Sequence, residues 1–289
     1  MTLSPSELRV AIAATIVLGL LVFLPMPRPV RPFWSLFFFG EYPWPLRLAL
    51  VLAPLALTLI LQRRLGVALP RLAEAMRGAR RATPWLLGVS SFVLFWLFRE
   101  RRHWGDAGYT VDILKGIADV GPLGRYFWKE PLDRLAAMAF TDLGRHLGLD
   151  VESSIALLSS LAGSVCVVVL WSLSARLGKT GPSRLVAFAL PLCAGGSQLF
   201  FGHVENYTLV TLAMLLFFRE GTGVVEGGSS LMRAGLAAAL AVSVHPLAAF
   251  LIAPLVALPF LRPQPASVRD IWRSMLAMVP GVLYFVAFY

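Results

Sequence analysis

Apolar stretches recur along the whole chain and alternate with short connections that carry charge, proline or glycine. A straight helix needs about 20 apolar residues to cross a bilayer, and several of these stretches are shorter. We expect their flanks to extend them, or the helices to tilt or break at internal prolines. The segments are 10–24, 48–61, 85–98, 155–175, 185–201, 207–218, 234–244, 247–261 and 275–289. The pattern predicts an all-α polytopic transmembrane bundle of about nine spans.

The composition agrees with a membrane protein and excludes several other classes. Of the 289 residues, 57% are hydrophobic and 15% charged, whereas soluble domains average about 25% charged residues. The net charge of +10 comes from bases in short connections, which indicates contact with anionic lipid and not with nucleic acid. Cys166 and Cys193 lie inside apolar segments and resemble core residues more than a disulfide or metal pair.

The arginines predict the orientation, because cytoplasmic loops carry the excess of basic residues. Loop 62–83 contains six arginines and one acid, Glu74. We therefore place it in the cytoplasm, together with 176–184, 262–273 and a flexible linker at 221–230. The N-terminus is then inside, and 25–46, 99–152, 202–206 and the turn at His245 face outside. This describes a multi-pass protein of a bacterial-type inner membrane.

We expect a single transmembrane domain over 1–289. Residues 1–83 supply two extra N-terminal spans and the basic loop, and 99–152 form the outer loop that would carry the chemistry. The last segment reaches Tyr289 without a polar flank. We expect either a fragment of a longer protein or an end at the far membrane surface.

The long outer loop has the pattern of two amphipathic surface helices. Over 107–117, Tyr109, Ile113 and Ile117 share one stripe. Over 131–147, an apolar stripe runs along one face, and Asp133 and Arg134 lie elsewhere around the helix. Such helices lie in the interface with their apolar stripe in lipid. The leucine and alanine positions of the second stripe are Leu132, Leu135, Ala139, Leu143 and Leu147.

Asp106 is the first candidate for chemistry, because it lies between Gly105 and Gly108 where a span leaves the membrane. A carboxylate there could accept a proton from an acceptor hydroxyl or bind a divalent metal that holds a phosphate. Metal dependence stays open. Arg102 could pair with phosphate oxygens. The alternative is a Gly-Asp turn with interfacial arginines at a helix end.

A second cluster joins two spans with almost no loop and holds His203, Glu205, Asn206 and Tyr207 near membrane depth. Ionisable groups at that depth are costly and usually functional, so we read these four as substrate-binding residues. The alternative is a structural Glu205 bonded to an arginine of the outer loop.

Three more residues complete the predicted substrate site. Lys129 could hold a phosphate, and Glu130 could orient a sugar hydroxyl or simply lie at a helix N-terminus. His245, before Pro246, could bind a phosphate or only mark a kink. By span counting, we expect Asp106 and Glu205 to converge on one outer-facing cavity, with Lys129, His203 and Arg102 nearby.

The stretches H-W-G-D-A-G-Y at 103–109, W-K-E-P-L-D at 128–133 and G-H-V-E-N-Y at 202–207 resemble the GT-C superfamily of integral-membrane glycosyltransferases. The resemblance covers about 85–261. It implies that Asp106 is the catalytic acid of the outer loop, that the donor is a polyprenyl-phosphate sugar and that transfer inverts the anomeric centre. Two features depart from that class: two extra spans precede the acid, and Ala107 follows it where a second acid is usual.

Two other functions fit the same pattern. A transporter or flippase of a lipid-linked or small polar substrate would use Glu205 and the histidines as an ion relay, although we find no inverted repeat. A non-catalytic assembly subunit is the third reading. P-loop, dinucleotide, zinc-protease and serine-nucleophile motifs are missing from the sequence, which disfavours nucleotide-driven and covalent serine chemistry. The acceptor and the sugar are not readable from the sequence.

Overall fold

The computed structural model describes residues 43–46, 48–49, 52, 67–76, 81–99, 106–116, 130–193, 196–202, 207–264 and 266–288. The chain divides into two compact units, Met1–Ala75 and Met76–Tyr289. The described part of the first unit includes helical residues at 44–46, 48–49 and 67–75. The predicted span 10–24 and nearly all of 48–61 lie outside the described residues.

The second unit is built from helices alone over its described residues, which confirms the all-α class. Every predicted apolar segment from residue 85 onward corresponds to a helix or to two successive helices. The elements are α4 Thr83–Leu97, α5 Asp106–Leu114, α7 Pro131–His146, α8 Val151–Leu177, α9 Gly181–Cys193, the 3₁₀ helix η2 Gly196–Phe200, α10 Tyr207–Val225, α11 Leu231–Val244, the 3₁₀ helix η3 Pro246–Leu251, α12 Ile252–Leu261 and α13 Val268–Phe288.

Two of these helices, α8 and α10, are long and apolar enough to cross a membrane. Four more apolar stretches of helix are shorter: Thr83–Leu97, Gly181–Cys193, Leu231–Val244 and Pro246–Leu261. Within the described residues the structure therefore contains two full-length candidate spans. This is fewer than the seven spans predicted from residue 85 onward, because several of these helices are interrupted or end early.

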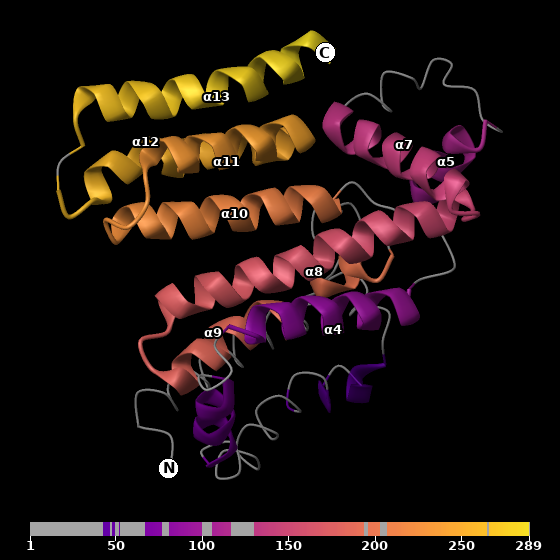
Figure 1. Ribbon diagram of the computed structural model, residues 1–289, viewed down its shortest axis with the longest axis horizontal. Helices are drawn as coiled ribbons and strands as arrows, with labels where there is room; N and C mark the ends of the chain where they lie inside the picture. The colour runs from indigo at the N-terminus through magenta and orange to yellow at the C-terminus, as the bar shows by residue number, and fades with distance from the viewer. Residues whose placement is uncertain are drawn as a thin grey trace. The chain divides into compact units, whose positions relative to one another are not determined.

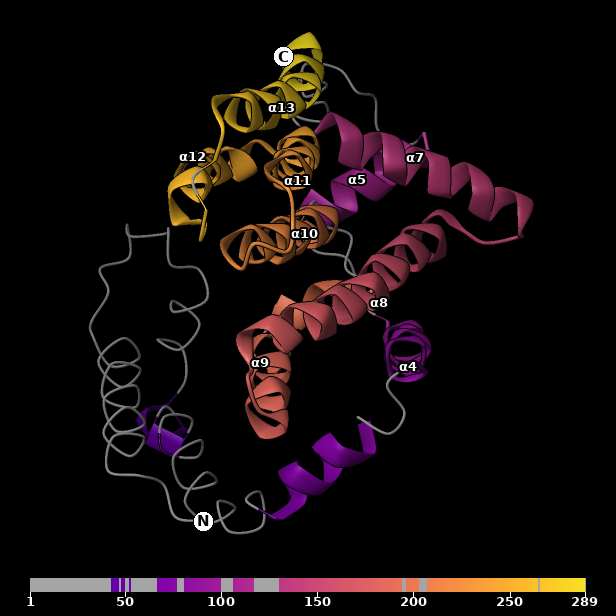
Figure 2. The same ribbon diagram turned by 60° about the vertical axis from the view of Figure 1, so that its left-hand side comes forward.

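The longer helices of the second unit lie side by side in a row. Figure 1 shows the order α13, α11, α10, α8 and α4, and neighbours in this row pack against each other. In Figure 2 the row is seen more nearly end-on, with α7 crossing the end of α8. Apolar residues of α10, α11 and α12 form the main core, and a second cluster surrounds Phe95, Cys166 and Phe200.

Small residues bring α11 and α13 into close contact. A Cβ added at Gly235 would lie 2.5 Å from the Ser274 carbonyl oxygen, and one at Gly281 would lie 2.4 Å from the Ala239 carbonyl oxygen. The backbones therefore touch where the glycines are. Helices pack in this way in membranes, where close approach replaces the hydrophobic drive that operates in water.

The prediction of a flexible linker at 221–230 is wrong over the first half of that segment. Helix α10 continues to Val225, and Gly223 is buried in it. The helix ends in a compact cap: Gly227 has φ +78°, and the Gly228 N–H donates to the Gly223 carbonyl at 2.8 Å. Two ion pairs also order this region, because Glu226 binds Arg176 of α8 at 2.7 Å and Glu220 binds Arg219.

Helix α7 exposes several of its leucines and buries two of its charged residues. Leu135, Leu143 and Leu147 are exposed, as predicted for a stripe that lies in lipid. The buried face includes Asp133 and Arg134. Leu132 of the predicted stripe packs against the main core instead, and Asp142 and Arg145 are exposed beside the leucines. Exposed leucines next to exposed charges are typical of a helix at a membrane interface.

The prediction of a surface helix over 107–117 is only partly correct. Helix α5 ends at Leu114, and Gly116, at φ +72°, follows it, so the helix does not reach Ile117. Its buried residues are Thr110 and Val111 and not the predicted stripe. Val111 packs on Ile155 of α8, and this contact decides which face of the helix is covered.

Candidate functional site

A buried group of polar side chains lies where α5, α7 and the junction of α11 and η3 meet. We call Glu130, Asp133, Arg134, His245 and Thr110 the Glu130 cluster. Their exposed fractions lie between 4% and 9%. Burial without partners would cost several kcal/mol for such groups, so the contacts among them decide whether the arrangement is stable.

Glu130 accepts hydrogen bonds from two directions. It occupies the N-cap position of α7, yet its side chain makes no capping bond. Its Oε1 atom lies 2.9 Å from His245 Nε2, and its Oε2 atom accepts from an Arg134 guanidinium nitrogen at 3.3 Å. The simple capping role that the sequence allowed for Glu130 is therefore replaced by a bridge between two elements.

His245 is held at a helix break in one tautomer. Its backbone N–H donates to the Ala241 carbonyl at the end of α11, and its Nδ1 atom accepts from the Leu247 N–H at 3.0 Å. Because Nδ1 accepts, the ring proton lies on Nε2 and points to Glu130. The Tyr207 ring lies beside the imidazole, with ring centroids 5.4 Å apart. The kink at His245–Pro246 thus also positions a proton donor.

Arg134 connects the cluster to α5. One of its terminal nitrogens donates to Thr110 Oγ1 at 3.0 Å. Thr110 lies one helical turn after Asp106, the first residue of α5. The contact therefore places the helix that begins at Asp106 directly against the helix that carries Glu130.

Asp133 adds a second carboxyl group to the cluster. Burial raises its pKa to about 7, and the Glu130 carboxylate adds to this increase, whereas Arg134 and His245 oppose it. The group therefore exchanges a proton near neutral pH. A carboxyl group with that property, next to a fixed guanidinium, can give or accept a proton during a reaction.

The structure brings together some of the predicted site residues. Glu130 and His245, which the sequence suggested separately, are in direct contact, and Tyr207 lies beside them. Asp106 begins α5, and its side-chain contacts are not described. Arg102, Lys129, His203, Glu205 and Asn206 lie outside the described residues, so the convergence of Asp106 and Glu205 stays a prediction.

Sequence reasoning did not identify Asp133, Arg134 and Thr110 as part of the site. One signal was present, because Glu130 and Arg134 are four residues apart around a proline that favours a helix start. No sequence signal links Thr110 or His245 to them. Among the described residues there is no group of three or more His, Cys, Asp or Glu side chains that could hold a metal ion.

The comparisons with known proteins do not place the chain in a family. No family model matches it, and comparison with the curated proteins and with the solved structures finds no significant match.

Proposed function

We propose that this protein is an integral-membrane glycosyltransferase of the GT-C type. It moves a sugar from a polyprenyl-phosphate donor to an acceptor at the outer face of a bacterial-type inner membrane. In this proposal the chain crosses the membrane about nine times, its N-terminus is cytoplasmic, and the Glu130 cluster and Asp106 face outside.

Three features of the second unit support a membrane location. Two helices have the length and apolarity of spans, α11 and α13 touch through glycines, and α7 turns leucines outward. In Figure 1 the α8–α9 turn and the start of α7 lie at opposite ends of the helix row. Arg176, Lys179 and Arg184 lie at the α8–α9 turn, whereas the Glu130 cluster lies at the opposite end, as the rule of basic cytoplasmic loops requires.

One observation carries the proposal of an enzyme. A continuous series of polar contacts runs from His245 through Glu130 and Arg134 to Thr110, and Thr110 lies one turn from Asp106. A fixed cation, a proton donor and a carboxyl group that titrates near neutral pH are thus gathered beside the helix that begins with the candidate base. Preorganised charges of this kind stabilise the charge that develops in a transition state.

The reaction needs a proton acceptor and cations that stabilise the leaving phosphate. The acceptor hydroxyl oxygen forms a bond to the anomeric carbon while its proton passes to the Asp106 carboxylate. The bond between the anomeric carbon and the phosphate oxygen breaks, and the phosphate leaves with the electron pair. Cations of the outer loop, with Lys129 and Arg102 as candidates, would stabilise that negative charge.

A transfer assay tests this proposal. The purified protein would be placed in vesicles with a radiolabelled polyprenyl-phosphate sugar and a lipid extract as acceptor source. We expect labelled product that depends on the protein and on the donor. Movement of intact donor to the other leaflet without release of polyprenyl phosphate would support a flippase and contradict the enzyme. The position of the Glu130 cluster at the end of the helix row, and not midway along a candidate span, favours the enzyme.

A further inference from the structure

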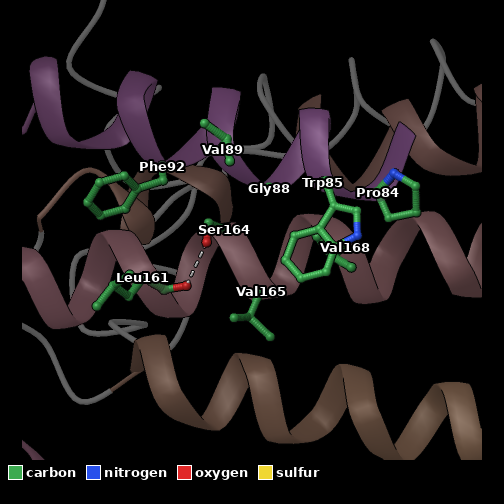
Figure 3. Close-up of a pocket in the computed structure, with 9 residues that line it drawn as sticks. All are labelled: Pro84, Trp85, Gly88, Val89, Phe92, Leu161, Ser164, Val165 and Val168. Carbon is green, nitrogen blue, oxygen red and sulfur yellow. Dashed lines mark hydrogen bonds between the residues drawn. The ribbon is translucent and has the colours of Figure 1, made fainter. Parts of the chain in front are cut away.

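A groove of about 580 Å³ lies between α4 and α8, far along α8 from the Glu130 cluster. Its walls are the stretch from Pro84 to Phe92 of α4 and the stretch from Leu161 to Val168 of α8 (Figure 3). Among the nine lining residues, only Ser164 and the indole of Trp85 carry polar side-chain atoms. The Ser164 hydroxyl donates to the Leu161 carbonyl at 3.1 Å. A ligand in this groove would therefore make almost entirely hydrocarbon contacts.

The depth of the groove along α8 indicates a hydrocarbon occupant. Leu161–Val168 lie at the middle of Val151–Leu177, one of the two helices that have the length and apolarity of a span. At about 1.5 Å per residue, Leu161 lies roughly 15 Å along the helix from its first residue. In a bilayer this level is occupied by lipid chains and not by water.

The size of the groove fits one acyl chain. The lining stretch from Pro84 to Phe92 covers roughly 12 Å along α4 at about 1.5 Å per residue, which is close to the roughly 15 Å of hydrocarbon in one leaflet. The chain of a polyprenyl phosphate is much longer than an acyl chain and would extend well beyond the groove. Gly88 closes one side, because a Cβ there would lie 3.2 Å from Val168 Cγ2.

An aromatic ladder connects the groove to a cation. Phe92, at one end of the groove, stacks with Trp96, with centroids 6.5 Å apart. The Arg99 guanidinium carbon lies 4.3 Å from the Trp96 ring centroid, and one nitrogen donates to the Trp96 carbonyl. Hydrogen bonding to Ser153 lowers the pKa of Asp150 at the start of α8, and the Arg99 charge adds to this decrease. The cation is therefore at the end of the helix row where a lipid phosphate would lie.

We propose that the α4–α8 groove binds one acyl chain of a membrane phospholipid, with the phosphate of that lipid beside Arg99. The proposal requires a bilayer and does not depend on the transfer reaction. Its failure and the failure of the proposed glycosyltransferase activity are therefore separate results.

Native mass spectrometry of the protein in detergent micelles, titrated with dioleoyl phosphatidylglycerol, tests the proposal. We expect one tightly held lipid on the wild type, and at least tenfold weaker retention by Val89→Trp, which fills the groove. Leu86→Trp is the matched control, since Leu86 and Val89 are 60% and 61% exposed on the same helix and Leu86 does not line the groove. Arg99→Gln should also weaken retention. Equal retention by Val89→Trp and Leu86→Trp would contradict the proposal.

A second arm fills the groove after folding. Ser164→Cys, in a background with Cys166→Ala and Cys193→Ser, would be treated with N-cyclohexylmaleimide once the protein is purified. We expect the labelled protein to lose the tightly held lipid and the unlabelled protein to keep it. Retention after labelling would contradict the assignment. Displacement of the phospholipid by undecaprenyl phosphate at equal concentration would also overturn it, because the groove would then belong to a prenyl chain.

Discussion

The Glu130 carboxylate joins three parts of the chain that the sequence keeps far apart. It accepts from His245 at the end of α11 and from Arg134 on its own helix, and Arg134 continues the contact to Thr110 of α5. Each partner is less than a tenth exposed. Removal of one member of a buried ion pair is costly because the other charge is left without compensation.

Glu130→Ala should therefore destabilise the fold strongly. We expect a loss of about 3–5 kcal/mol, the usual result of breaking a buried pair from one side. Asp142→Ala is the control on the same helix, because the Asp142–Arg145 pair is 69–71% exposed and should change stability by less than about 1 kcal/mol. Thermal unfolding in detergent measures both changes, because a loss of 1 kcal/mol lowers Tm by roughly 2–4 °C. Equal shifts for the two variants would show that the Glu130 contacts are energetically unimportant.

Asp133 should make the stability of the protein fall as pH rises. The ordinary pKa of an aspartate is 3.8 and burial raises that of Asp133 to about 7, so the folded state binds more protons than the unfolded state between these values. By linkage, this contribution is lost progressively from about pH 4 to pH 7 and stays absent above it. The shift is a little over three pH units, which corresponds to at most about 4 kcal/mol.

Asp133→Asn tests this directly, because the amide cannot ionise. We expect the variant to be more stable than wild type at pH 8, and the difference to shrink toward pH 4. Unfolding curves at pH 4, 6 and 8 measure the difference. A variant that was less stable than wild type at pH 8 would mean that the ionised carboxylate is stabilised by its neighbours.

The candidate residues could be predicted from the sequence singly, but their grouping could not. Glu130 follows from its place before Pro131, and His245 from its place before Pro246. The hydrogen bond between them depends on the packing of α7 against α11, and no local pattern encodes that packing. The pattern predicts that Asp133 and Arg134 lie away from the apolar stripe of a surface helix, because charged residues usually remain exposed. Arg134 is buried because it donates to Glu130 and to Thr110 of α5, whereas burial of Asp133 raises the pKa of its carboxyl group.

At the scale of the elements, hydrophobic periodicity predicted which segments are helical and failed at their ends. The apolar pattern predicts that the helix over 207–218 stops before the glycines of 221–230, but α10 continues to Val225. Glycines lower helix propensity, yet Gly223 faces Arg176 and Ser229 closely, and a larger residue would not fit. Tertiary contact thus overrides local preference at this point.

The α11–α13 contact predicts a specific sensitivity to small changes. Gly281→Ala would place a Cβ 2.4 Å from the Ala239 carbonyl oxygen and push the helices apart, at a cost of about 1–3 kcal/mol. Gly221→Ala is the matched control inside α10, since its Cβ would meet only Leu258 at 3.6 Å. That change should be neutral or stabilising by up to about 1 kcal/mol. Thermal unfolding compares the two, and equal effects would contradict the close packing.

At the scale of the whole molecule, the account depends on which side of the membrane each end faces. Bases surround the α8–α9 turn, while α5 and α7 lie at the other end of the row. We expect a membrane-impermeant maleimide added to spheroplasts to label Asp142→Cys and not Lys179→Cys, since both positions are exposed. The background would lack Cys193, which is exposed, and Cys166. The reverse labelling would place the Glu130 cluster in the cytoplasm and remove the proposed site from the outer face.

The central claim is that Asp106 acts as the base in sugar transfer, and the transfer rate of Asp106→Asn tests it most directly. The amide keeps the shape of the side chain and cannot accept the proton, so we expect a loss of about 10²- to 10⁴-fold in turnover with unchanged thermal unfolding. Asp112→Asn, an exposed acid on the same helix, should keep near-normal turnover. If a well-folded Asp106→Asn transferred sugar at the wild-type rate, Asp106 would be a turn residue and the proposed mechanism would be wrong.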